Sequence, residues 1–176
     1  GSMDYLHRHF KMRADPSAIL EGAKSVVVVA LNYRQHAATE TKGEAKAHGR
    51  VAMYAWGEDY HEVIGSKLAK LVERMKAELA EPFAARVCVD TAPILERELA
   101  AAAGIGWIGK NTLVLHHKIG SYFFLGAIVT TLELVPDEPL PDHCGTCTAC
   151  LDACPTQAFP KPYEMDASRC ISYLTI

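Results

Sequence analysis

The pattern of apolar positions divides residues 1–135 into predicted strands and helices. Residues 25–33 form a continuous β-branched run, which is typical of a strand buried on both faces of a sheet. From residue 60 onward the apolar side chains recur at helical spacing, which predicts an amphipathic helix that ends before Pro82. The apolar positions of this helix are Ile64, Leu68, Leu71, Val72, Met75 and Leu79.

Shorter elements are predicted on either side of these two. Residues 4–24 form a helical or irregular segment with a helix start at Asp15 and Pro16, and the polar residues 35–49 form a mobile surface loop. This order predicts a mixed α+β fold. The remaining elements are a strand at 86–89, a helix that follows Pro93 and runs through Ala103, a glycine-rich loop at 104–111, and strands at 112–116 and 122–134 joined by a turn around Gly120.

A proline-rich segment at 135–141 cannot continue a sheet and predicts a domain boundary. Residues 1–135 then form the α+β domain, and residues 136–176 form a small cysteine-bound module. In this module Asp166 is expected to cap a final helix that carries Cys170. The sequence stops at Ile176 inside this helix without capping residues, so we expect a fragment of a longer protein.

Four cysteines follow the boundary with the spacing that wraps cubane iron–sulfur clusters. Cys144, Cys147 and Cys150 are separated by two residues each, and Cys154 follows after three more, directly before a proline. In two-cluster ferredoxins the fourth cysteine of such a run ligates the other cluster, so Cys154 is expected to face away from the first three. Cys170 is a candidate fifth ligand. A zinc ribbon is the alternative, although its cysteine pairs usually lie further apart.

The composition is that of an ordinary globular protein, with 49% hydrophobic and 22% charged residues. No apolar run reaches membrane-spanning length, and no signal peptide opens the chain. Five of the 6 cysteines lie between residues 144 and 170, which favours metal ligands in a reducing compartment over disulfides. The net charge of −3 gives no overall basic field for nucleic acid, so such a partner would need a local patch, for instance at residues 7–13.

Three further segments are candidates for chemistry. Asp90 ends a predicted strand just before a helix; its spacing favours a helix cap, and the alternative is an acid that protonates a ligand above the strand end. The loop at 104–111 lacks the glycine spacing of the dinucleotide fingerprint. It is either a tight structural turn or a close approach to a large flat ligand, with Lys110 as a polar contact. The aromatic and polar residues at 54–61 are more typical of packing at a helix entrance than of a cofactor site.

Taken together, these segments resemble epoxyqueuosine reductase, a family of cobalamin- and iron–sulfur-dependent enzymes of queuosine biosynthesis. The matching segments follow one another in the family's order and run nearly from end to end. They are MDYL at 3–6, RADP at 13–16, YAWGEDYH at 54–61, VDTAPILERE at 89–98, GWIGKNT at 106–112, the cysteine run at 144–157 and RCISYLT at 169–175.

The resemblance implies an oxidoreductase that converts epoxyqueuosine to queuosine in the anticodon loop of tRNA, the last step of the pathway. It implies a cobalamin-binding α+β domain followed by a ferredoxin-like module, with electrons passing from an electron donor through two 4Fe–4S clusters to cobalamin. Asp90 matches the family's proton donor to the departing oxygen. The enzyme is expected to be cytoplasmic and monomeric, without membrane association.

Matched position by position, Cys144, Cys147 and Cys150 hold one cluster, and Cys154 with Cys170 holds part of the second. The family's second cysteine run and its helical-repeat tail have no counterpart in these 176 residues. We therefore expect the chain to retain the cobalamin pocket while its cluster ligands are incomplete. The positions that match corrin-lining residues are Arg13, Met53, Asp90, Val114, Leu125 and Ser172, with Lys110 close by.

Two other function classes remain open on the residues alone. The first is a non-catalytic iron–sulfur electron-transfer module, which needs its clusters but neither Asp90 nor a corrin pocket. The second is a zinc-binding interaction module. Bound corrin separates the reductase from the electron carrier, and iron with acid-labile sulfide excludes a purely zinc site.

Overall fold

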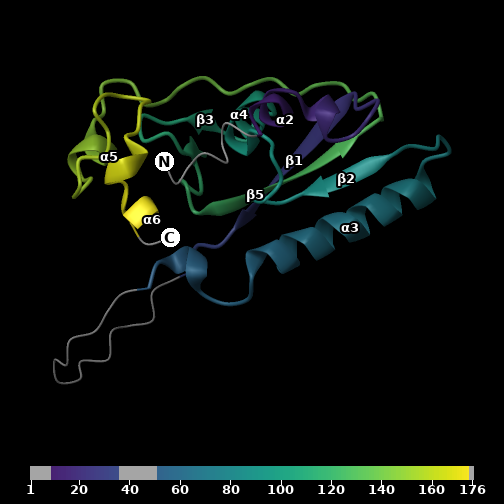
Figure 1. Cartoon of the computed structure of the whole chain (residues 1–176), viewed down its shortest axis with the longest axis horizontal. Helices are drawn as coiled ribbons and strands as arrows, with labels where there is room; N and C mark the ends of the chain where they lie inside the picture. The colour runs from purple at the N-terminus through teal and green to yellow at the C-terminus, as the bar shows by residue number, and fades with distance from the viewer. Residues whose placement is uncertain (1–8, 36–50, 175–176) are drawn as a thin grey trace.

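The computed structural model describes residues 9–35 and 51–174 and has a three-stranded antiparallel sheet at its centre (Figure 1). The strand order is β1 (Ser25–Asn32), β5 (Phe123–Thr130) and β2 (Ala85–Cys88). Ala127 of β5 pairs with Val28 on one side and with Cys88 on the other. The mixed α+β class predicted from the sequence is confirmed.

The strand buried most completely is β5 rather than β1. Residues 126–130 of β5 are all buried, whereas β1 lies at the edge of the sheet and its residues are half-buried or exposed. The predicted burial of residues 25–33 on both faces is therefore wrong for β1. The β-branched run identified a strand correctly, but only the central position in a sheet buries both faces.

One face of the sheet is covered by the long helix α3 (Tyr60–Glu78), which begins at its cap Asp59. Its buried residues Ile64, Leu68 and Val72 pack against Ile128 of β5. These three residues belong to the apolar face that the helical spacing predicted. The helix ends four residues before Pro82, as expected. By contrast, the apolar positions Leu71 and Leu79 of the same pattern are exposed.

The opposite face is covered by α2 (Phe10–Ala14), the 3₁₀ turn η1 (Pro16–Ala18) and α4 (Glu96–Ala102). Asp15 caps η1 by accepting a hydrogen bond from the amide of Ser17, which confirms a helical start at this position. Ala127 and Val129 of β5 belong to this second core layer, together with Ile19, Cys88 and Ile94. The sheet is thus enclosed between α3 on one face and the shorter helices on the other (Figure 1).

The glycine-rich loop contains part of a small second sheet, which the sequence did not predict. Strand β3 (Trp107–Ile108) pairs with β4 (Val114–Leu115), and neither pairs with β5. A turn at Gly120, closed by bridge pairing with His116, then leads into β5. A Cβ at Gly106 would collide with the carbonyl oxygen of Leu115, so a glycine there serves packing within the hairpin. This supports the structural-turn interpretation of the loop.

Residues 131–148 contain no helix or strand, and short helical elements follow. The first is α5 (Ala149–Asp152), followed by η3 (Ala167–Arg169) and α6 (Ile171–Leu174); the turn η2 (Met53–Ala55) lies earlier in the chain. Asp166 caps η3, and Cys170 lies between η3 and α6, so the prediction of one helix carrying Cys170 is wrong.

The predicted surface loop at 35–49 lies outside the described residues except for its first position. The division into two domains at residue 135 stays a prediction. Within the described ranges, no helix is long and apolar enough to cross a membrane.

Gly126 allows α3 to approach β5 closely, because a Cβ at this position would lie 2.6 Å from Ile64 and 3.1 Å from Leu68. We expect Gly126→Ala to lower the free energy of unfolding by about 1–3 kcal/mol, since the packed helix must shift away. Gly65→Ala is the matched control, because a Cβ there meets nothing within 4 Å and alanine favours the helix. Urea unfolding measures both changes, and equal stability of the two variants would contradict the close packing.

Candidate functional site

Asp90 lies in the turn between β2 and α4 with a left-handed backbone, at φ +47°. Non-glycine residues adopt this conformation rarely, and aspartate is among those that tolerate it. The helix-cap role that its spacing favoured is wrong, since α4 begins at Glu96 with Leu95 as N-cap, and no side chain of the described residues caps it. Asp90 therefore occupies an unusual backbone position for a reason other than capping α4.

Asp90 is attached to both layers that enclose the sheet. Its backbone amide donates to Oε1 of Glu96 on α4 at 2.8 Å. Its Oδ2 lies 3.2 Å from Nε2 of His61, at the start of α3. The other ring nitrogen of His61 lies 2.7 Å from Oδ1 of Asp59, the cap of that helix. The Asp90 carboxylate thus ends a chain of polar groups that begins at the exposed Asp59.

A cavity of about 870 Å³ opens beside Asp90. This volume is near the upper end of the range for ligand pockets, so the cavity suits a large ligand. Four of the seven predicted cofactor-binding residues line it, namely Arg13, Asp90, Val114 and Leu125. Tyr60, Thr91, Glu96, Arg97 and Phe123 also contribute to its walls.

The other three predicted cofactor residues lie elsewhere. Met53 is in η2, where its sulfur accepts a hydrogen bond from the amide of Gln35. Ser172 is in α6, and Lys110 faces the cysteine module. None of the three lines the cavity beside Asp90 in the described part of the chain.

Burial and neighbouring charge set the acid–base properties of the cavity wall. Burial raises the pKa of Glu96 from its ordinary 4.5 to about 6, with the Asp90 charge adding to the effect. Tyr60 has its pKa raised to about 12, first by burial and then by the Asp90 carboxylate. The hydrogen bond to Asp59 raises the pKa of His61. Sequence reasoning missed Glu96 and His61, although His61 lies in the segment at 54–61 that was assigned to packing.

Arg13 adds an unsatisfied donor to this wall. Its Nε is buried and has no hydrogen-bond partner among the described residues. Buried polar groups are nearly always paired, so an unpaired donor on a cavity wall is suited to a polar group of a bound ligand. Its position agrees with the cofactor role predicted for Arg13.

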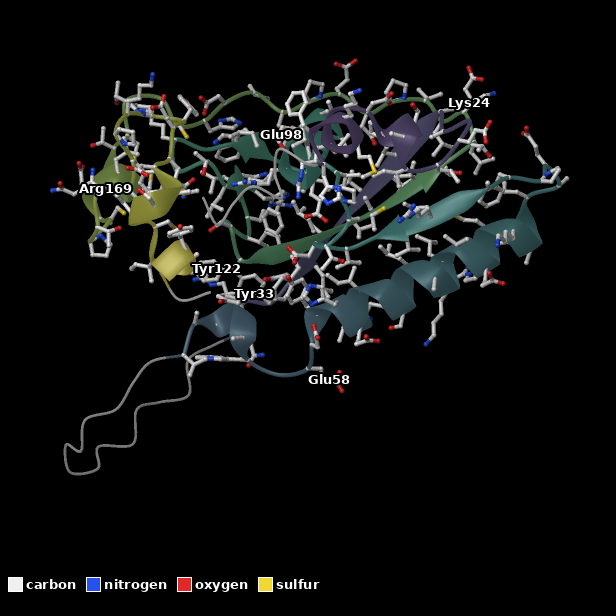
Figure 2. The ribbon with its side chains drawn as sticks, viewed as in Figure 1. Lys24, Tyr33, Glu58, Glu98, Tyr122 and Arg169 are labelled. Atoms are coloured by element: carbon white, nitrogen blue, oxygen red, sulfur yellow. The ribbon has the colours of Figure 1, made fainter. Side chains whose placement is uncertain are left out.

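An aromatic row links the cavity to the end of the sheet. The ring of Tyr60 stacks on Phe124 at 4.1 Å, and Phe124 in turn contacts Tyr33 at 4.5 Å. Figure 2 shows Tyr33 beside Tyr122, and their ring centroids are 6.0 Å apart. This row stabilises the start of α3, and with it the position of His61.

The cysteine module presents free thiols. All 6 cysteines lie within the described ranges; Cys88 is buried in the core, and the other five are partly or fully exposed. In the described chain no three His, Cys, Asp or Glu side chains are close enough to share one metal ion. A cubane cluster takes one thiolate at each iron, so its ligands lie further apart than those of a single ion. Hydrogen bonds from the amide of Ala158 and from Thr156 lower the pKa of Cys154, which favours the thiolate that metals require.

Lys110 attaches the first cysteine loop to the β3–β4 hairpin. Its ammonium donates to the carbonyls of Gly145 and Cys147, at 2.6 and 2.9 Å. The carbonyl of Lys110 accepts from the amide of Tyr163 at 2.9 Å. The structure therefore places Lys110 between the β3–β4 hairpin and the backbone that carries the predicted cluster ligands.

Comparisons with known proteins find similar sequences over the whole length of the chain. Residues 13–91 match the family described as epoxyqueuosine reductase QueG, DUF1730, and residues 143–176 match the 4Fe-4S double cluster binding domain. The epoxyqueuosine reductase of Cellulophaga algicola is 46% identical over 100% of this chain and 56% of its own length. The chain spans about half the length of the curated relatives that it matches.

The similar solved structures are also epoxyqueuosine reductases. The epoxyqueuosine reductase of Streptococcus thermophilus superposes with a TM-score of 0.88 at 38% identity, over 94% of this chain and 45% of that one. A crystal structure of epoxyqueuosine reductase with an epoxyqueuosine-modified tRNA-Tyr stem loop has a TM-score of 0.80 at 36% identity, over 94% and 44% of the two chains.

The fold and site define an α+β protein with a large ligand cavity and a 4Fe–4S binding segment. Over its whole length the chain is similar to the epoxyqueuosine reductases.

The buried carboxyl of Glu96 predicts a pH dependence of stability. Because its pKa is raised in the folded state, its contribution to stability is full below pH 4.5 and is lost as pH rises through about 6. Glu96→Gln has no carboxyl to ionise and does not lose this contribution. Between pH 4.5 and about 6 its free energy of unfolding should therefore rise by about 1 kcal/mol relative to that of wild type, after discounting for solvent exposure. Urea unfolding at pH 4 to 8, roughly spanning the window, measures the change. The exposed Glu98→Gln on the same helix is the control, and a Glu96→Gln curve parallel to wild type would contradict this account.

Removal of the Lys110 ammonium tests the link between hairpin and cysteine loop. We expect Lys110→Met to hold iron about 10-fold more weakly after anaerobic reconstitution, because the cysteine loop loses the two hydrogen bonds that the Lys110 ammonium donates to its carbonyls. Iron retained during a chelator titration is the measurement. Lys118→Met, on the turn before Gly120, makes the same charge change away from the cysteines and should retain iron like wild type.

Proposed function

We propose that this chain carries the catalytic pocket of an enzyme that reduces epoxyqueuosine to queuosine in tRNA. In this proposal cobalamin occupies the cavity beside Asp90, and 4Fe–4S clusters on the cysteine module supply its electrons. The observation that carries the proposal is the placement of Asp90, which is held from two helices in an unusual backbone conformation at a cavity of about 870 Å³. The similarity of the chain to epoxyqueuosine reductases supports the substrate.

The residues of the cavity suit a corrin. The cavity is large, its apolar walls include Val114 and Leu125, and Arg13 offers for a polar substituent a buried donor that has no partner in the described part of the chain. Apolar side chains support the flat face of a macrocycle, while polar groups at the rim fix its orientation. When bound, cobalamin supplies a reduced cobalt that can transfer electrons to the epoxide.

Asp90 acts as the proton donor. Reduction of an epoxide breaks a carbon–oxygen bond, and the departing oxygen needs a proton as its negative charge develops. The Asp90 side chain is 56% exposed in this structure, so water is excluded from it only when a ligand covers the cavity. Such cover favours the neutral, proton-carrying carboxylic acid.

His61 gives Asp90 a route to solvent protons. Its two ring nitrogens face the Asp59 and Asp90 carboxylates at 2.7 and 3.2 Å. The Asp59 end of this chain is exposed, and it stays outside the cavity. A proton used by Asp90 can therefore be replaced through His61 while a bound ligand covers the cavity.

The cysteine module supplies the electrons in this proposal. Cys144, Cys147 and Cys150 hold one cluster, and Cys154 with Cys170 contributes to the second. Lys110 holds the first cysteine loop against the β3–β4 hairpin. The partners are a tRNA with epoxyqueuosine in its anticodon loop and an electron donor, and the enzyme acts as a cytoplasmic monomer. A crystal structure of a relative with an epoxyqueuosine-modified tRNA stem loop supports this substrate.

Replacement of Asp90 by Asn tests the proton donor. We expect Asp90→Asn to lower the rate of epoxide reduction by about 10²- to 10⁴-fold, since the amide cannot give up a proton, while cobalamin binding is unchanged. Turnover is measured on the protein at its natural length, with epoxyqueuosine-containing tRNA and a chemical reductant. Glu58→Gln is the control, because Glu58 is exposed and Figure 2 shows it beside the start of α3, away from the sheet. Wild-type turnover by Asp90→Asn would contradict the assigned role.

A further inference from the structure

Asp90 is held by its backbone as well as by its side chain. The amide of Asp90 donates to Oε1 of Glu96 at 2.8 Å, and Asp90 has φ +47°. A left-handed backbone costs conformational energy for a residue with a Cβ, so it persists only where surrounding contacts impose it. The Glu96 carboxylate supplies one such contact, directly on the strained residue.

Glu96 is attached to a fixed element. It opens α4, whose Ala100 is fully buried against Val114 and Phe123, while the amide of Ile105 bonds back to the carbonyl of Ala100. Among the described residues, the segment between Asp90 and α4 forms only short-range hydrogen bonds, such as that from the amide of Ile94 to the carbonyl of Ala92. The Glu96 side chain therefore ties a turn without regular structure to a helix that the core holds in place.

We propose that Glu96 is a positioning residue, whose carboxylate holds the Asp90 turn in the conformation that points the Asp90 side chain at the cavity. The proposal rests on the proposed function for its catalytic consequence, but the hydrogen bond itself is independent of that function. Glu96 acts through the backbone of Asp90 and not by contact with the reacting atoms.

The alternative role for Glu96 is a proton store beside Asp90. The charged and titratable groups that face it are Asp90 in the turn, Arg13 from α2, Arg97 on its own helix, Tyr60 from α3 and Cys88 from β2. The two roles predict different behaviour for glutamine, which keeps a carbonyl acceptor but carries no exchangeable acidic proton. A positioning residue is rescued by Gln, whereas a proton store is not.

Hydrogen exchange of the turn tests the hydrogen bond directly. In the 176-residue chain we expect Glu96→Ala to speed amide exchange at residues 89–95 by about 10-fold, since the charged acceptor is lost. Glu96→Gln should stay close to wild type, and helix α3 serves as the internal reference for global folding. Unchanged exchange in Glu96→Ala would overturn the proposal. Amide exchange in Glu96→Gln as fast as in Glu96→Ala would also overturn it, because the negative charge of Glu96, and not its hydrogen-bond acceptor, would then hold the turn.

Turnover by the protein at its natural length tests the catalytic consequence. We expect Glu96→Ala to lower kcat about 10-fold with KM for the tRNA unchanged, and Glu96→Gln to restore kcat. A KM effect alone, or a Gln variant as slow as Ala, would overturn the positioning role. If wild type itself fails to reduce the epoxide, the proposed function fails, while the exchange experiment still decides whether Glu96 holds the turn.

Discussion

The structure depends on the burial of β5 between two layers of helix. Along this strand the residues alternate, so that Ile128 contacts α3 on one face while Ala127 and Val129 contact the opposite layer. Each layer thus takes its position from the same strand. Gly126 lets α3 approach closely, and the distance between the layers is set by these contacts.

The position of Asp90 follows from this enclosure. His61 belongs to the helix on one face of the sheet and Glu96 to a helix on the other, and both bind Asp90. A change in the packing of either layer would therefore move the carboxylate relative to the cavity. Lys110 joins the cysteine module to the β3–β4 hairpin through two hydrogen bonds, so the loop that carries the proposed cluster ligands is attached to the sheet side of the molecule.

The parts of this arrangement that could be predicted are those with a local signature. Helix α3 has an apolar stripe and a cap, and the spacing of the four cysteines after residue 143 is itself the signal for a cluster. Strand β4 lies within the strand predicted at 112–116, whereas β3 has two residues, too few for a period, and was not predicted. The sequence predicts a helix that carries Cys170 because Asp166 is a good cap, but the element that Asp166 caps is a single 3₁₀ turn. Glu96 could not be identified because its role depends on the left-handed turn at Asp90, which brings together residues from three elements.

We propose that the cavity beside Asp90 holds a corrin. The most direct measurement is the visible absorption spectrum of the anaerobically reconstituted chain after incubation with cobalamin and desalting. We expect retained corrin bands at one equivalent per chain, with the same retention in Asp90→Asn. Iron and sulfide retained without corrin would contradict the account and would leave an iron–sulfur electron-transfer module.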